Sequence, residues 1–267
     1  MLEAEIGVFG GSGFYSFVEG LSEHTLSTPY GSPSAPVAIG ELGGRSIAFL
    51  PRHGPHHEFP PHSINYRANM WAFKELGVTR VLAPSAAGSL QPDIHPGDVV
   101  VCDQLIDRTS GRPETYYDGP LSVHVSFADP YCPQLRPLAI KACVSARMDV
   151  HDGGTVVVIQ GPRFATRAES SSYQDQGWDV INMTQYPEAY LARELEMCYV
   201  NMSLITDYDV GVEGRPEIAP VTMEEALRVF AENTGRLRQA LFELLELIPS
   251  ERDCSCGDAL AGTPARP

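Results

Sequence analysis

Short apolar runs alternate with helix-like segments along this chain, and this alternation most restricts how the chain can fold. Strand-like runs occur at residues 5–9, 36–39, 46–50, 80–83, 98–102, 155–159 and 199–205. Helices are predicted around residues 64–72, from Pro187 onward, and from the capping sequence that begins at Thr222 to Pro249. The pattern predicts an α/β fold with a largely parallel sheet that helices cover.

The chain is predicted to form one domain. Its 267 residues suit a single α/β core, and no internal repeat or long linker rich in Pro, Gly and Ser divides it. We expect a domain over residues 1–249, followed by a flexible C-terminal tail over residues 250–267, which contain few large apolar side chains. Residues 107–135 form a long excursion rich in Pro, Tyr and Asp, and such excursions are often functional.

The net charge excludes some classes of partner. It is −15 at pH 7, which disfavours nucleic acid and an anionic membrane surface. The first residues are acidic, unlike a secretory signal, and no apolar stretch approaches the roughly 20 residues that span a bilayer. We therefore expect a cytoplasmic protein.

The metal-binding residue types do not form a recognisable motif. Cys102, Cys132, Cys143 and Cys198 lack the spacing of zinc ligands, which indicates buried, reduced thiols. Cys254 and Cys256 form a close pair, for which two exposed thiols are favoured over a redox-active or structural disulfide. Histidines at 53, 56, 57 and 62 lie in a loop-like stretch with several prolines, so we expect no metal there.

Small residues and cations follow several of the predicted strands. The turn at residues 10–13 has the sequence Gly-Gly-Ser-Gly, in which Ser12 is a candidate anion donor, although a plain tight turn is an equal alternative. Arg52 and His53 follow another strand, at the edge where open α/β sheets bind ligands. Residues 85–89 form either a close-packed turn or a second phosphate clamp.

Two carboxylates follow the last strand, at Asp207 and Asp209. Such a pair can share a proton, which raises one pKa and provides an acid near neutral pH. From this triplet alone, a solvated turn is the favoured alternative.

Taken together, these fragments resemble 5′-methylthioadenosine phosphorylases of the trimeric purine nucleoside phosphorylase family, over residues 5–245. The resemblance lies in segments that occur in the family's order, at residues 10–13, 52–54, 65–69, 86–90, 96–98, 161–164, 182–184 and 206–209. It implies a single domain with a mixed central β-sheet flanked by helices, a homotrimer, and phosphorolysis in purine and methionine salvage. Inorganic phosphate would be the co-substrate, with no metal or organic cofactor.

The resemblance also assigns roles to individual residues. Phosphate would be bound by Ser12, Arg52, His53, Ser85, Ala86 and Thr184. Met183 would contact the ribose, Phe164 the base, and Asp207 and Asp209 the N7 atom and 6-amino group of adenine. His124 would reach into a neighbouring subunit's pocket. Cys254 and Cys256 resemble a CxC tail that occurs in some family members, where it is associated with disulfides.

The pair of aspartates favours adenine, because a protonated carboxyl can donate to N7 while another oxygen accepts from the 6-amino group. Ala165 departs from the family, which commonly carries Ser there, and Val221 is our candidate for the pocket of the 5′-thiomethyl group. Both positions leave open a broader purine nucleoside phosphorylase acting on adenosine or inosine. A nucleotide-sensing binding module is the alternative outside enzymes.

Overall fold

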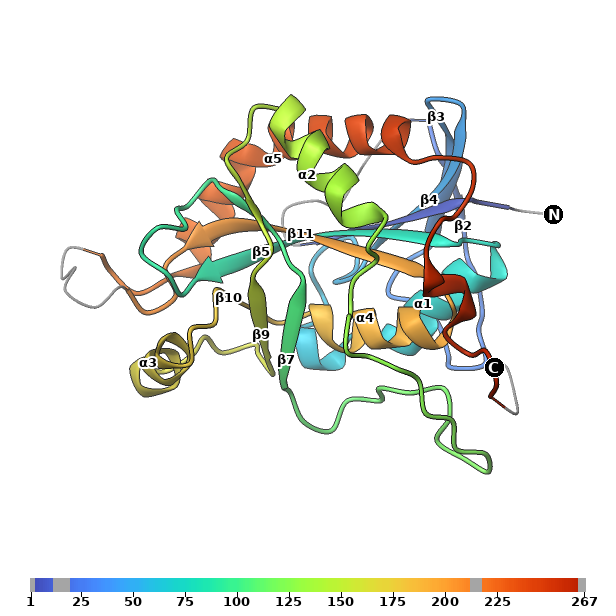
Figure 1. Cartoon of the computed structure of the whole chain (residues 1–267), viewed down its shortest axis with the longest axis horizontal. Helices are drawn as coiled ribbons and strands as arrows, with labels where there is room; N and C mark the ends of the chain where they lie inside the picture. The colour runs from blue at the N-terminus through green and yellow to red at the C-terminus, as the bar shows by residue number, and fades with distance from the viewer. Residues whose placement is uncertain (1–2, 12–19, 212–217, 264–267) are drawn as a thin grey trace.

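The computed structural model describes residues 3–11, 20–211 and 218–263 (Figure 1). Ser12 lies outside these residues. The described strands are β1 (Ile6–Gly10), β2 (Ser22–His24), β3 (Val37–Leu42), β4 (Arg45–Pro51), β5 (Arg80–Ser89), β6 (Val99–Val101), β7 (Gln104–Arg108), β8 (Val150–Asp152), β9 (Thr155–Ile159), β10 (Val180–Asn182) and β11 (Cys198–Asp207). The helices are α1 (Tyr66–Glu75), α2 (Leu135–Ser145), α3 (Arg167–Asp175), α4 (Gln185–Glu194) and α5 (Met223–Leu247), with 3₁₀ turns η1 (Pro61–Ser63) and η2 (Ser255–Asp258).

All the described strands join one mixed sheet. Its main path runs β2-β3-β4-β1-β5-β10-β9-β7, and β11 pairs with both β5 and β6. The central strands β4, β1, β5 and β11 are parallel to one another. Their outer neighbours β3, β10 and β6 run antiparallel to β4, β5 and β11 respectively. The predicted mixed α/β architecture is confirmed.

Helices cover both faces of the sheet, as Figure 1 shows, with α2 and α5 on one side and α1 and α4 on the other. The α2 and α5 side buries residues such as Val8, Leu82 and Leu241. The α1 and α4 side buries Phe9 and Phe73. Among the described helices, none combines the length and apolar character needed to cross a bilayer.

Local signals account for several helix ends. Thr222 Oγ1 accepts a hydrogen bond from Glu225 N at 3.2 Å, so α5 begins at the predicted cap. Helix α2 was not predicted from the sequence. Its first turn contains Pro137, which a helix tolerates there because the first N–H groups have no intrahelical partner.

The C-terminal segment differs from the flexible tail expected over residues 250–267. Residues 250–263 lie against the domain, with Cys256 and Leu260 buried. Arg80 Nη2 donates to Pro249 O at 2.9 Å, and Leu260 N donates to Glu196 Oε1 at 3.3 Å. The sparse apolar residues of this segment are therefore placed where they are buried, which composition alone does not reveal.

Candidate active site

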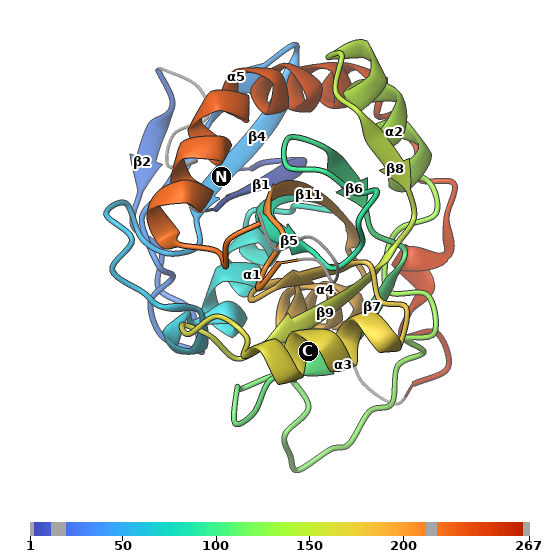
Figure 2. The same cartoon turned by 90° about the vertical axis from the view of Figure 1, so that its left-hand side faces the viewer.

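A cavity of about 390 Å³ opens at the carboxyl ends of the central strands. Figure 2 looks onto this end of the sheet, between α5 and α3. Gly11 follows β1, Arg52 follows β4, and Asp207 ends β11. Carboxyl ends of parallel strands meet at one edge of a sheet, which explains how residues distant in sequence line one cavity.

Most of the predicted site residues line this cavity. They are Arg52, His53, Ser85, Ala86, Phe164, Met183, Thr184, Asp207 and Asp209. The structure does not bring His124, Ala165 and Val221 into its lining. His124 is exposed on the long excursion, Ala165 packs on the small core that contains Ile159 and Ile181, and Val221 lines an adjacent groove.

Arg52 is buried and already paired. Its Nε donates to Glu188 Oε1 at 2.6 Å and its Nη2 to Glu188 Oε2 at 3.1 Å, while Nη1 donates to Pro84 O at 3.0 Å. Glu188 thus compensates the guanidinium charge in the described structure. Each Nη nitrogen carries a second N–H for a ligand. A Cβ at Gly11 would lie 2.9 Å from Arg52 Nη1, so only glycine leaves this close approach open.

His53 is a neutral imidazole. Burial, the largest cause, lowers its pKa from 6.5 to about 3. Its Nδ1 lies 2.9 Å from Phe59 O, and since a carbonyl can only accept, Nδ1 carries the proton and Nε2 is an acceptor. The His57 ring stacks on His53 with centroids 4.5 Å apart. His57 also lines the cavity, although the sequence assigned it no role.

Ser85 and Thr184 add two hydroxyl groups to the cavity lining. Ser85 Oγ accepts from Asn201 Nδ2 at 3.0 Å and from Asn182 Nδ2 at 3.3 Å, which leaves its O–H to donate. Thr184 precedes α4 and its side chain makes no capping hydrogen bond. The combination of an Arg, hydroxyl groups and small residues suits a small oxyanion.

The two carboxyl groups lie at another part of the cavity lining, at the end of β11. Burial raises the pKa of Asp207 from 3.8 to about 6, against hydrogen bonds from Thr206 Oγ1 at 2.7 Å and Asp209 N at 2.8 Å. Burial also raises the pKa of Asp209. Asp209 Oδ2 is buried and makes no hydrogen bond of standard geometry among the described residues, although the nearby Ser170 hydroxyl acts to lower the pKa of Asp209. The favoured solvated turn is therefore wrong, and a buried oxygen of this kind calls for a partner.

Gly88 makes room for this pair. A Cβ there would lie 2.8 Å from Asp207 Oδ1 and 3.1 Å from Ile181 Cγ2. Asp209 has a φ of 51°, a left-handed conformation that Asp adopts more readily than most residues. The hydrogen bond from Asp209 N to Asp207 Oδ1 therefore requires both the left-handed conformation of Asp209 and the absence of a side chain at Gly88.

An apolar wall closes the cavity, and sequence reasoning missed it. It is formed by the first turns of α5, through Met223, Ala226, Leu227 and Phe230. Leu227 and Phe230 lie on the apolar stripe of this helix, and such a stripe ordinarily faces the core. The side chain of Phe230 is buried, whereas Met223 and Leu227 are more than a third exposed at the cavity mouth. That partial exposure could not be read from the stripe.

Comparison with known proteins agrees with this arrangement. A family model described as the phosphorylase superfamily matches residues 5–246. A purine nucleoside phosphorylase from Streptomyces coelicolor is 52% identical, over 98% of this chain and 96% of the relative. An S-methyl-5′-thioadenosine phosphorylase from Thermofilum pendens is 51% identical, over 97% of this chain and 98% of the relative.

Solved structures give the same result. Methylthioadenosine phosphorylase from Schistosoma mansoni, in complex with adenine, has a TM-score of 0.87 and 36% identity over 94% of this chain and 93% of that one. A methylthioadenosine phosphorylase from an antarctic soil metagenomic library has a TM-score of 0.90 and 37% identity, over 98% of this chain and 92% of that one. The resemblance carried by the ordered sequence fragments is confirmed, and the chain belongs to the phosphorylase superfamily.

Proposed function

We propose that this protein is a pentosyltransferase that cleaves S-methyl-5′-thioadenosine with inorganic phosphate, releasing adenine and 5-methylthioribose 1-phosphate. The observation that carries the proposal is the buried carboxyl pair at the end of β11, where Asp207 has its pKa raised to about 6. A protein that only binds a nucleoside does not need a protonated carboxyl, whereas a protonated carboxyl assists the breaking of a glycosidic bond. The relatives named as methylthioadenosine phosphorylases support this choice.

The departing base requires a proton donor. A purine leaves more easily when its N7 is protonated, because the electrons of the breaking bond then enter a neutral base. A carboxyl with a pKa near 6 keeps part of its population protonated close to neutral pH. The buried Oδ2 of Asp209 has a lone pair available to accept from the 6-amino group of adenine. The pair therefore suits a 6-aminopurine better than a 6-oxopurine.

Phosphate is the proposed nucleophile, held by Arg52, His53, Ser85, Thr184 and the backbone N–H of Ala86. The phosphate anion stabilises the positive charge that develops at C1′, then forms the new C–O bond. His53 Nε2 can only accept, so we propose that it binds the O–H of a hydrogen phosphate. Ser12 belongs to the same proposed set. The reaction as proposed draws on no metal or organic cofactor, since phosphate provides the nucleophile and carboxyl groups the proton.

The apolar wall of α5 favours a substrate with an apolar 5′ substituent. Met223, Ala226 and Leu227 offer carbon and sulfur atoms, with no hydrogen-bond partner for a 5′-hydroxyl. We place the 5′-thiomethyl group here in preference to our earlier candidate Val221. Met183 and Phe164 remain the proposed contacts of the ribose and the base.

The second candidate is a purine nucleoside phosphorylase acting on adenosine or inosine. The 52% identity to the enzyme of that name from Streptomyces coelicolor supports it. Release of the free base from methylthioadenosine, adenosine and inosine, each with and without phosphate, distinguishes the two. We expect phosphate-dependent adenine release with the highest kcat/KM for methylthioadenosine. Equal or faster cleavage of inosine would favour the second candidate, and cleavage without phosphate would exclude phosphorolysis.

We also propose a homotrimer in which His124 completes a neighbour's pocket. His124 is exposed and does not line the cavity of its own chain. Phe164, Met223 and Leu227 leave an exposed apolar rim at the mouth of that cavity. A neighbouring subunit would cover that rim. We propose the cytoplasm as the compartment, because none of the six cysteines, all of which the structure describes, is in a disulfide. We propose neither nucleic acid nor a membrane as a partner, because of the net charge of −15.

A further inference from the structure

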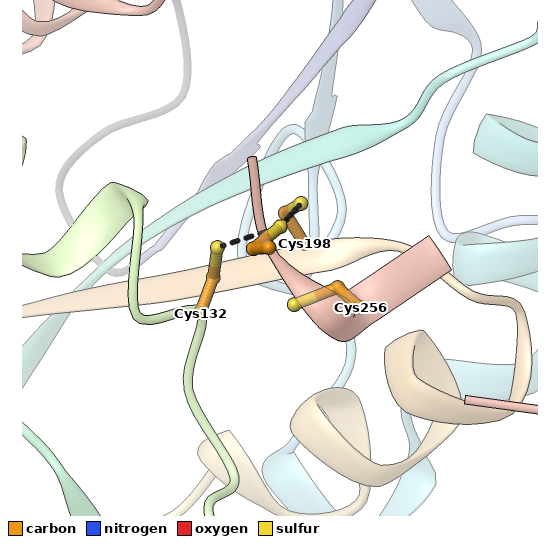
Figure 3. A group of neighbouring side chains, drawn as sticks. Cys132, Cys198 and Cys256 are labelled. Atoms are coloured by element: carbon orange, nitrogen blue, oxygen red, sulfur yellow. Dashed lines mark hydrogen bonds between the residues drawn. The ribbon is translucent and has the colours of Figure 1, made fainter. Parts of the chain in front are cut away.

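Four cysteine side chains converge at the end of the molecule away from the cavity. Cys132 lies just before α2, Cys198 begins β11, and Cys254 and Cys256 lie at the start of η2. Figure 3 labels Cys132, Cys198 and Cys256 of this group. Their four sulfur atoms all lie within 4.8 Å of one another. Three segments far apart in sequence thus bring the four sulfur atoms together, and the proposed reaction uses none of these cysteines.

Two of the sulfur separations are close to those of a tetrahedral metal site, and the others are at most 4.8 Å. Cys132 Sγ and Cys254 Sγ are 3.7 Å apart, and Cys198 Sγ and Cys254 Sγ are 3.4 Å apart. Four sulfurs around a zinc ion, each at about 2.3 Å, are separated by about 3.8 Å. A disulfide requires about 2.05 Å, which none of these pairs has. The thiols are therefore arranged around a common centre rather than joined in pairs.

We propose that Cys132, Cys198, Cys254 and Cys256 bind one structural zinc ion. A closed set of four thiolates is the ligand set that zinc takes in structural sites, and it leaves no position for a water or substrate. Binding replaces the four S–H bonds by four Zn–S bonds and releases four protons. No electron transfer is involved.

The surroundings suit a cluster of thiolates. The backbone N–H groups of Leu135 and Gln134 hydrogen-bond to the Cys132 sulfur, as donors commonly do around metal-bound ligands. The Arg252 guanidinium packs on Gly257, next to Cys256, where an added Cβ would lie 2.7 Å from Nη2. This cation reduces the excess negative charge that four thiolates around a divalent ion would leave.

The position of the cluster indicates a structural role. Cys198 and Asp207 are the two ends of β11, about 30 Å apart for a strand of this length. Figure 1 shows the C-terminal segment on the opposite side from the tips of β5 and β11. The site would fix residues 250–263 to α2 and β11, and so hold in place the segment that composition predicts to be flexible.

The first test measures zinc and thiols on the intact protein, purified with a reductant that does not bind zinc. We expect about one zinc per chain by atomic emission. Titration with an organomercurial should release that zinc as four thiols react, and all six cysteines should react in denaturant with chelator and no reductant. Cobalt(II) added to metal-free protein should give the absorption of a tetrahedral tetrathiolate site.

A matched pair of variants assigns the ligands. Cys256→Ser removes one proposed ligand and should lower the affinity for zinc at least about tenfold. Cys143→Ala removes a buried thiol of α2 outside the cluster and should keep one zinc per chain. If Cys256→Ser does not fold, the cobalt spectrum and zinc release of the parent protein still decide the matter.

Two outcomes would overturn the proposal. One is parent protein that holds no zinc as purified and takes up neither zinc nor cobalt after full reduction. The other is a peptide map of aerobic protein in which these cysteines are paired as disulfides and zinc is absent even under reductant. Phosphorolysis is measured separately, so its failure and the failure of the zinc site are distinguishable.

Discussion

At the scale of single residues, the proposed role of the carboxyl pair at the end of β11 leads to a prediction about which base the protein cleaves. Replacing Asp207 by Asn removes an acid and presents an amide NH₂ that suits a 6-oxo group. We expect phosphorolysis of methylthioadenosine to fall about 10²–10⁴-fold, the usual contribution of a general acid, and cleavage of inosine to fall much less or to rise. Steady-state kinetics with both substrates test this, with Asp209→Asn in parallel. Unchanged base preference and rate in both variants would contradict the proposal.

The raised pKa of Asp207 leads to a prediction about how kcat/KM and stability depend on pH. Its pKa is about 6 in the folded protein, so the protonated form is lost as pH rises through 6. The parent kcat/KM should carry a descending limb there, and Asp207→Asn should lack it. Phosphate ionises identically in both assays and cancels in the comparison. Because the folded-state pKa exceeds the unfolded value of 3.8, this ionisation also reduces stability as pH rises from about 4 to about 6.

A third prediction at this scale concerns Arg52. Arg52→Ala removes a proposed phosphate donor and also leaves the Glu188 carboxylate buried without its ion-pair partner. We expect the phosphate KM to rise strongly and the free energy of unfolding to fall by about 3–5 kcal/mol. Phosphate saturation curves and denaturant unfolding measure the two effects. Arg52→Ala combined with Glu188→Gln should recover stability but not the phosphate KM. A parent-like KM in either variant would remove Arg52 from the phosphate site.

At the scale of elements, the sequence located the ends of strands better than the faces of helices. The turns at Arg52 and Asp207 follow apolar runs, and parallel pairing of those runs brings the turns together. The first turn of α5 was different. Its stripe predicts burial, but whether Leu227 faces the core or the cavity depends on how the whole helix docks, and no local pattern records that.

The position of the first turns of α5 at the cavity leads to a prediction about substrate preference. Leu227→Ser places a hydroxyl on the apolar wall where we put the 5′-thiomethyl group. We expect kcat/KM for methylthioadenosine to fall about 10-fold or more while adenosine changes little or improves, since a pocket able to hydrogen-bond a hydroxyl discriminates strongly. Leu237→Ala, in the buried part of the same helix, is the control for stability. An equal loss on both substrates would show that Leu227 only supports the fold.

At the scale of the whole molecule, the sequence did not predict which distant segments of the chain lie side by side. The four thiols come from three segments, and the spacing of Cys132 and Cys198 gives no sign that they meet residues 254 and 256. Packing of residues 250–263 depends on acceptors such as Glu196 on the far side of the core. Ligand sets assembled through tertiary contacts leave no local signature, unlike the Asp207 and Asp209 turn.

The proposed trimer makes the last prediction. If His124 reaches a neighbour's substrate, His124→Ala should keep the trimer and raise the KM for methylthioadenosine several-fold, with the phosphate KM unchanged. Sedimentation velocity and kinetics on the same sample measure both. His95→Ala, another exposed histidine outside the cavity lining, should leave the KM unaltered. The exposed rim of Phe164 and Leu227 gives the physical reason, because an enzyme with an uncovered apolar mouth would hold its substrate in contact with water. A parent protein that sediments as a fully active monomer would remove both the trimer and the role of His124.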